Sequence, residues 1–232
     1  MIENTDATVC FDNGPLYDIS LTYRQLNEVL STIMAGVTTS FRFPGLLNSD
    51  LRKLAVSMVP FPSRPFLMPG LAPLAFRGRI PPGAQTLPEI TRQVFSVYST
   101  MVSCNPRRGQ NIAGAAIFRG QMSMEEIDKE MSNAQKEDSH NFVDRIPDNV
   151  KTSLYDFPLR GHRMSATTIA NNTAIERLFR VLATRYWDMI CRRAFLHWYK
   201  GVGMEVEDFD EAYWSMFDLL SEYRECENVT TE

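Results

Sequence analysis

The chain has 232 residues and a formal net charge of −4; 44% of its residues are apolar and 22% charged, which excludes a disordered or collagen-like protein. No stretch approaches the roughly 18 consecutive apolar residues that a membrane span requires, so we expect no membrane partner. Residues 205–232 hold ten of the 28 carboxylates against Arg224 alone, and this strongly acidic end argues against a nucleic-acid-binding protein.

The first half of the chain predicts two helices and a proline-rich connection. Thr22-x-x-Gln25 is a capping box, in which both side chains satisfy free backbone N–H groups, and it precedes an apolar stripe ending at Val37. A shorter helix over 51–58 is predicted to follow Asn48, a good N-cap. Residues 60–88 contain eight prolines and predict mainly loop, with a weak strand over 66–68.

The second half predicts strands between helices, then two long helices. Capping boxes begin at Thr86, Ser123, Thr173 and Asp208, and their helices carry apolar positions through Met101, Met131, Ile190 and Tyr223 respectively. Short runs rich in β-branched or small residues predict strands over 111–118, 150–155 and 164–169. The order predicts an α+β body followed by a helical C-terminal piece.

Residue patterns give little support to an enzyme. There is no glycine-rich phosphate loop, and the three histidines stand alone in the sequence. Glu125 and Glu126 fall in a first helical turn, where negative charge is stabilised by the helix dipole. The four cysteines are widely scattered, which fits free thiols in a reducing cytoplasm rather than a metal site. We therefore expect an interaction protein with no catalytic residue and no metal ligand.

Several long segments resemble β-tubulin, in the same order, from about Glu3 to about Tyr223. They include FRFPG (41–45), LNSDLRKLAV (47–56), MVPFP (58–62), MPG (68–70), AAIFRG (115–120), NVKT (149–152), MSAT (164–167) and AFLHWY (194–199). The resemblance implies a two-layer α/β sandwich of the tubulin/FtsZ intermediate-domain type, followed by a C-terminal helical hairpin. It divides the chain into an end of the nucleotide-binding domain with the central core helix (1–38), the intermediate domain (39–172) and the helical domain (173–232).

The same resemblance implies three contacts on the guanine side of GTP. Asn13 matches an asparagine that hydrogen-bonds guanine, Tyr23 the tyrosine that stacks on the base, and Asn27 the asparagine that pairs with its edge. An amide suits this task because it offers both a donor and an acceptor. The resemblance begins near the end of the family's GTPase domain, after the phosphate loop and the magnesium-placing acid. We therefore expect weak GTP binding or none, no magnesium site and no catalysis by the isolated chain, although the parent family hydrolyses GTP on assembly.

The longitudinal contact with α-tubulin is implied for Asn48, Asp50, Lys53 and Lys151. At the position of Lys53, α-tubulin-like chains carry a glutamate that promotes attack of water on GTP. An ammonium group cannot act as that base, so Lys53 implies the β-type arrangement. The acidic helix 208–226 resembles the ridge that motors and associated proteins bind. The implied location is the microtubule cytoskeleton in the cytoplasm.

Some positions depart from the family. The lateral-contact loop over 75–86 contains the unusual segment IPPG (80–83), and Glu28 replaces a histidine of the taxane pocket. Ser40 and Ser57 replace a cysteine and an asparagine near the colchicine pocket. Two interpretations follow: a divergent β-tubulin-like constituent of microtubules, or a non-polymerising fragment or decoy that binds α-tubulin without binding or hydrolysing GTP.

Overall fold

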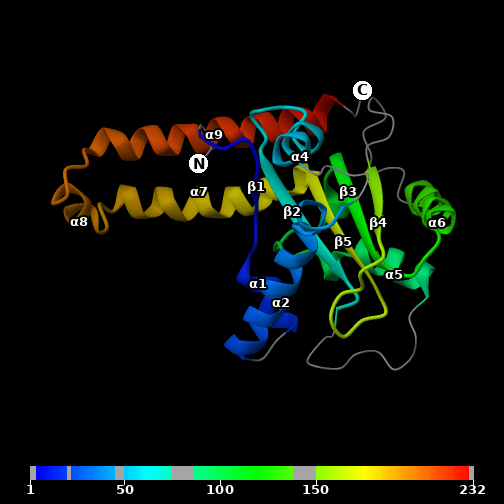
Figure 1. The fold of residues 1–232 in the computed structure, drawn as a ribbon. Helices are drawn as coiled ribbons and strands as arrows, with labels where there is room; N and C mark the ends of the chain where they lie inside the picture. The colour runs from blue at the N-terminus through cyan, green and yellow to red at the C-terminus, as the bar shows by residue number, and fades with distance from the viewer. Residues whose placement is uncertain (1–3, 20–21, 45–49, 75–85, 138–149, 230–232) are drawn as a thin grey trace.

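A five-stranded mixed sheet forms the centre of the protein in a computed structural model, which describes residues 4–19, 22–44, 50–74, 86–137 and 150–229 (Figure 1). The strands are β1 (Thr8–Val9), β2 (Phe66–Ala72), β3 (Asn111–Gly120), β4 (Val150–Tyr155) and β5 (Met164–Asn172). Their order across the sheet is β1-β2-β5-β3-β4. The outer pairs, β1–β2 and β3–β4, are parallel, and β5 is antiparallel to both of its neighbours.

Helices cover both faces of the sheet. The first face carries α1 (Asn13–Ile19), α2 (Tyr23–Val37), α3 (Thr39–Arg42) and α4 (Leu51–Met58). The second carries α5 (Leu87–Val94) and α6 (Met124–Glu137). In the described part of the chain, short 3-10 turns lie at Val97–Ser99, Pro106–Arg108 and Thr173–Ile175.

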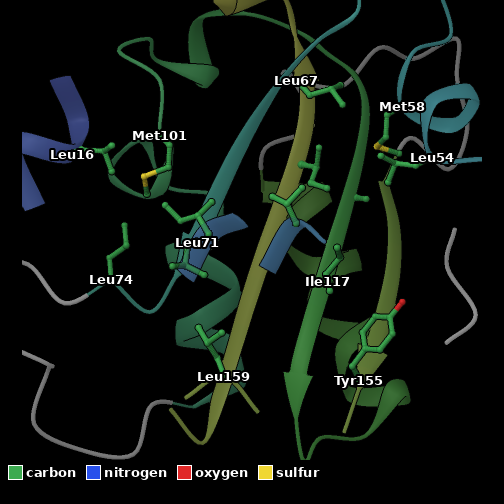
Figure 2. Close-up of a cluster of buried hydrophobic side chains, with 14 of the residues drawn as sticks. Leu16, Leu54, Met58, Leu67, Leu71, Leu74, Met101, Ile117, Tyr155 and Leu159 are labelled. Atoms are coloured by element: carbon green, nitrogen blue, oxygen red, sulfur yellow. The ribbon is translucent and has the colours of Figure 1, made fainter. Parts of the chain in front are cut away.

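The strands alternate their side chains between cores on the two faces of the sheet, because successive residues of a strand point to opposite faces. Leu67 and Leu71 of β2 and Ile117 of β3 join the first core with residues of α1, α2 and α4 (Figure 2). Ala72 of β2 and Phe118 of β3 join the second core, with residues of α5 and α6. The sheet is therefore a central layer that holds α2 and α4 in fixed positions relative to β4.

A helical hairpin completes the chain. Helices α7 (Glu176–Cys191) and α9 (Val206–Val229) run side by side and project beyond the sheet, with the short α8 (Leu196–Lys200) at the far end (Figure 1). The Tyr186 hydroxyl donates a 3.0 Å hydrogen bond to the carbonyl of Phe209 and so links the two helices. The predicted fold, an α+β sandwich followed by C-terminal helices, is confirmed.

Two sequence predictions for the region around β2 differ from the structure in extent. The strand expected over 66–68 is present but runs to Ala72, as a fully buried strand of seven residues, and residues 75–85 of the proline-rich stretch lie outside the described residues. Pro69 fits there because on that edge β2 meets a loop, whose Met101 N–H donates to the Pro69 carbonyl at 3.0 Å. The helix after Thr86 has the predicted capping box but ends at Val94, where the Ser99 hydroxyl donates to the Val94 carbonyl at 2.7 Å.

The predicted helix starts also differ in detail. The N-cap of α4 is Asp50, whose carboxylate accepts from the Arg52 N–H at 3.2 Å; Asn48 lies outside the described residues. Asn172, not Thr173, caps the turn before α7, since its side chain accepts from the Ala174 N–H at 2.8 Å. Helix α9 begins two residues before Asp208, which instead accepts from the Glu205 N–H at 2.9 Å.

Candidate functional site

The three residues expected to contact a guanine base lie on α1 and α2, which pack against each other. Asn13 is exposed at the first position of α1. Tyr23 and Asn27 are one turn apart on the same exposed face of α2, and Tyr23 is 77% exposed. Tyr23 and Asn27 therefore share a surface open to a planar ligand.

Two neighbours that the sequence did not single out fix this end of the molecule. The Tyr17 hydroxyl of α1 is hydrogen-bonded to Tyr23, which raises the pKa of Tyr17 and joins α1 to α2. Partial burial favours a higher pKa for Asp12, but hydrogen bonds from Ser103 and from the N–H groups of Asn13 and Gly14 outweigh it, so the Asp12 pKa is lowered. The ionised Asp12 thus anchors the start of α1 to the loop that carries Ser103.

The residues expected at an α-tubulin contact form a second surface. Asp50 and Lys53 are both exposed at the start of α4, three residues apart on one side of the helix. Ser57 continues the same side one turn later, and the Lys151 ammonium group of β4 donates a 3.0 Å hydrogen bond to its hydroxyl. We call the set Asp50, Lys53, Ser57 and Lys151 the α4–β4 strip.

The sequence flagged Ser57 only as a departure from a family pattern, whereas the structure makes it the link between α4 and Lys151. A hydroxyl that accepts from a lysine 94 positions away leaves no local signal in the sequence. The expected contact residues Asp50, Lys53 and Lys151 are therefore brought together by a residue that sequence analysis did not select.

A buried amide holds α4 in place under the strip. The Asn171 side chain of β5 is fully buried and donates to the carbonyls of Met58 at 3.1 Å and Arg64 at 2.9 Å. Met58 is the last residue of α4, so its carbonyl would otherwise lack a helical partner. Asn171 thereby ties the end of α4 to the middle of the sheet and fixes the helix that carries Lys53.

The acidic C-terminal segment forms most of α9. Eight of its residues are carboxylates and one is Arg224. Glu211 and Asp218 are fully on the solvent side, whereas Glu227 accepts a 2.8 Å hydrogen bond from the Thr173 hydroxyl and helps to dock the helix. Within the part of the chain that the structure describes, no helix combines the length and apolarity needed to cross a membrane.

One comparison with known proteins bears on these surfaces. The family model of the Tubulin C-terminal domain matches residues 62–184, which is more than half of the chain. The match covers the strands and helices from β2 into α7, including Lys151 of the strip and Asn171 beneath it.

Proposed function

Because the chain belongs to the tubulin family, we propose that this cytoskeletal protein is a β-tubulin-like structural subunit that pairs with α-tubulin. Membership of this family supports a cytoskeletal role. The β-type identity and the pairing with α-tubulin are what we propose beyond it.

The α4–β4 strip is the observation that carries this proposal. Its lysines lie on separate elements, yet the Lys151–Ser57 hydrogen bond places both on one exposed surface beside Asp50. Exposed cationic groups on one surface suit a partner surface that presents phosphate or carboxylate oxygens. The nucleotide of a neighbouring α-tubulin subunit is such a group.

Lys53 also defines what the strip would do to that nucleotide. A lysine ammonium group donates hydrogen bonds and carries positive charge, but it has no lone pair with which to accept a proton from water. Lys53 would therefore stabilise the triphosphate without promoting its hydrolysis. This is the behaviour expected of a β-type subunit facing an α-type nucleotide.

Guanine-nucleotide binding by the chain itself is proposed to be weak. Tyr23 and Asn27 offer a stacking face and an amide for the base, with Asn13 on the adjoining helix. All three side chains are exposed, so the base would be covered on one side only and would lose little contact with water. We propose that the isolated chain does not hydrolyse GTP.

The exposed carboxylates of α9 support a second type of partner. A helix with eight carboxylates and one arginine attracts basic surfaces, as motors or microtubule-associated proteins would present. This contact is separate from the α4–β4 strip, since α9 belongs to the hairpin and the strip to α4 and β4.

A second candidate function is a decoy that binds α-tubulin without entering the lattice. The observation that favours it is the outer side of α2, where Tyr23 is 77% and Met34 53% exposed. Exposed apolar side chains on a helix that also packs in the core are typical of a surface that binds another domain or protein. A chain with this surface uncovered would bind a subunit end and block further addition.

Binding and co-sedimentation experiments separate these functions. We expect α-tubulin to bind the wild-type chain, and Lys53→Ala to weaken binding about tenfold, the loss of about 1.4 kcal/mol for a charge-assisted contact. Lys129→Ala is the matched control, because Lys129 is exposed on α6 and outside the strip. Co-sedimentation with taxane-free microtubules supports the structural subunit, binding without co-sedimentation supports the decoy, and no binding to α-tubulin contradicts both.

A further inference from the structure

Two arginines lie beside the same aromatic ring at one end of the sheet. The guanidinium carbon of Arg42, the last residue of α3, is 5.3 Å from the centroid of the Phe43 ring, and that of Arg119, near the end of β3, is 5.6 Å from it. Phe157, in the loop after β4, stacks on Phe43 with ring centroids 5.0 Å apart. We call Arg42, Phe43, Arg119 and Phe157 the double-arginine cluster.

Arg119 is a buried cation without a counter-charge. The residue is only 6% exposed, and its Nε donates a 3.0 Å hydrogen bond to the neutral carbonyl of Phe157. Among the described residues, neither Arg119 nor Arg42 forms an ion pair with a carboxylate. An arginine keeps its charge in a protein, and a buried charge without a partner is unfavourable. The cluster therefore lacks the negative group that its two cations require.

Both guanidinium groups are fixed through some of their donors and keep others. The Arg42 Nε donates to the Thr38 hydroxyl at 3.2 Å, and its Nη2 donates to the Ala35 carbonyl. The Nη nitrogens of Arg119 have no hydrogen-bond partner among the described residues and are not sealed from solvent. A guanidinium group has five N–H donors in a planar fork, so both arginines can still donate to an anion that enters from solvent.

The local charges also favour an anion at this place. Burial, and then the nearby charge of Arg42, lower the pKa of Arg119, and no described carboxylate acts in the opposite direction. The loop over 156–163, which borders the cluster, carries two arginines and a histidine against Asp156. Asp156 is exposed and pairs with neither arginine of the cluster. A bound anion would therefore reduce the repulsion between Arg42 and Arg119.

The cluster lies away from the α4–β4 strip. Arg119 is opposite Tyr155, the last residue of β4, whereas Lys151 is near the start of that strand. Figure 2 shows Tyr155 at the opposite end of the sheet from Met58 of α4. Because β3 and β4 are parallel, this end is where the carboxyl ends of two strands meet, which is where open α/β sheets bind ligands.

We propose that the double-arginine cluster binds a phosphate group, held between Arg42 and Arg119. Phosphate carries up to two negative charges on oxygens that point in different directions, so it can accept from two guanidinium groups on separate elements at once. The two oxygens of a carboxylate lie in one plane and suit a single guanidinium fork. The Phe157 ring, in a residue that is 54% exposed, borders the site and could contact the carbon part of a phosphate ester. The site is independent of the proposed pairing with α-tubulin.

Thermal unfolding in phosphate tests this site. At pH 7 and an ionic strength held constant with sodium chloride, about 20 mM phosphate is expected to raise the Tm of the wild type by about 4 °C, which corresponds to a dissociation constant of about 1 mM. Arg42→Gln is expected to reduce the shift to about 1 °C or less. Arg24→Gln should keep the full shift, because the Arg24 side chain is 90% exposed and lies on α2 outside the cluster.

Three results of this experiment would overturn the proposal. They are a wild type that does not respond to phosphate beyond the chloride baseline, a full response in Arg42→Gln, and an equal loss of response in Arg24→Gln. Circular dichroism of each variant before heating shows that its helices are intact.

A substitution that supplies negative charge from within the chain separates anion binding from a purely structural role of the arginines. Arg42→Glu places a carboxylate beside Arg119. In chloride buffer its Tm is expected to exceed that of Arg42→Gln, and phosphate is expected to have no further effect. A Tm below that of Arg42→Gln would mean that Arg119 does not lack a counter-charge, and the proposal would then be wrong.

Calorimetric titration of the wild-type chain identifies the source of the phosphate group. Inorganic phosphate and phenyl phosphate are the two probes. Tighter binding of phenyl phosphate indicates a phosphate ester as the ligand, and tighter binding of inorganic phosphate indicates the free ion. Saturable binding of neither probe overturns the proposal, whatever the outcome of the α-tubulin experiments.

Discussion

Lys151 on β4 donates a 3.0 Å hydrogen bond to Ser57 on α4, across 94 positions of the chain, and so places two lysines on one exposed surface. The two lysines are far apart in the sequence, and α4 and β4 meet because α4 packs on the sheet of which β4 is an edge strand. The pairing gives the proposed α-tubulin contact a defined geometry, and it can be removed by a single substitution.

Ser57→Ala is expected to weaken α-tubulin binding two- to fivefold, since Lys151 then loses its partner and must be ordered on binding. The free energy of unfolding should change by less than about 1 kcal/mol, because the bond is exposed. Calorimetric titration and urea unfolding measure the two effects. Thr152→Ala, which removes an exposed bond of 3.2 Å to Asp128, is the control and should leave α-tubulin binding unchanged.

Asn171→Ala is expected to lower the free energy of unfolding by about 2–4 kcal/mol. The substitution leaves the carbonyls of Met58 and Arg64 without their buried donor and opens a small cavity. Urea unfolding followed by circular dichroism measures the loss. A change below about 1 kcal/mol would show that water replaces the amide and that Asn171 does not hold α4.

Glu176→Gln is expected to loosen the base of the hairpin at a cost of about 1–2 kcal/mol. The Glu176 carboxylate is nearly buried and accepts from Arg180 at 2.6 Å and from Arg224 of α9 at 3.0 Å. Removing its charge leaves two arginines without their shared partner, although both remain partly in water. Thermal unfolding should compare Glu176→Gln with Glu28→Gln. The exposed ion pair between Glu28 and Arg24 should contribute about 0.5 kcal/mol or less to stability.

Thiol reactivity should follow burial. Burial raises the pKa of Cys10 to about 11 and that of Cys104 to about 12, whereas Cys191 is exposed. At pH 8 a thiol reagent should therefore modify Cys191 first and leave Cys10 and Cys104 intact in the folded chain. Mass spectrometry of the modified peptides identifies the order. Rapid modification of Cys104 under native conditions would contradict the packing of this loop against Met68.

The same two thiols predict how stability depends on pH. Their folded pKa values lie above the ordinary value of 9.0, so the folded state keeps protons that the unfolded state releases. Their contribution to stability is complete below pH 9 and is lost as the pH rises from 9 toward 11 and 12. Urea unfolding at pH 8, 9.5 and 10.5 should show this decline, and it should be shallower in Cys10→Ala/Cys104→Ala.

Local sequence patterns were sufficient for the α+β order and for most elements. The helices beginning near Thr22, Thr86 and Ser123 and the strand over 150–155 were predicted because capping and apolar spacing act within a few residues. The strand β2 was underestimated, because Pro69 in its middle argues against a strand unless one edge lacks a continuous partner. Only the tertiary structure supplies that edge.

The surfaces divide in the same way. The order of residues along the chain was enough to show the family resemblance and the acidic character of the last helix. It also identified the candidate residues Asp50, Lys53 and Lys151. The link through Ser57 and the anchor at Asn171 were decided by the fold, since each joins groups from separate elements. A sequence records which groups are available, whereas their distances depend on how helices and strands pack on the sheet.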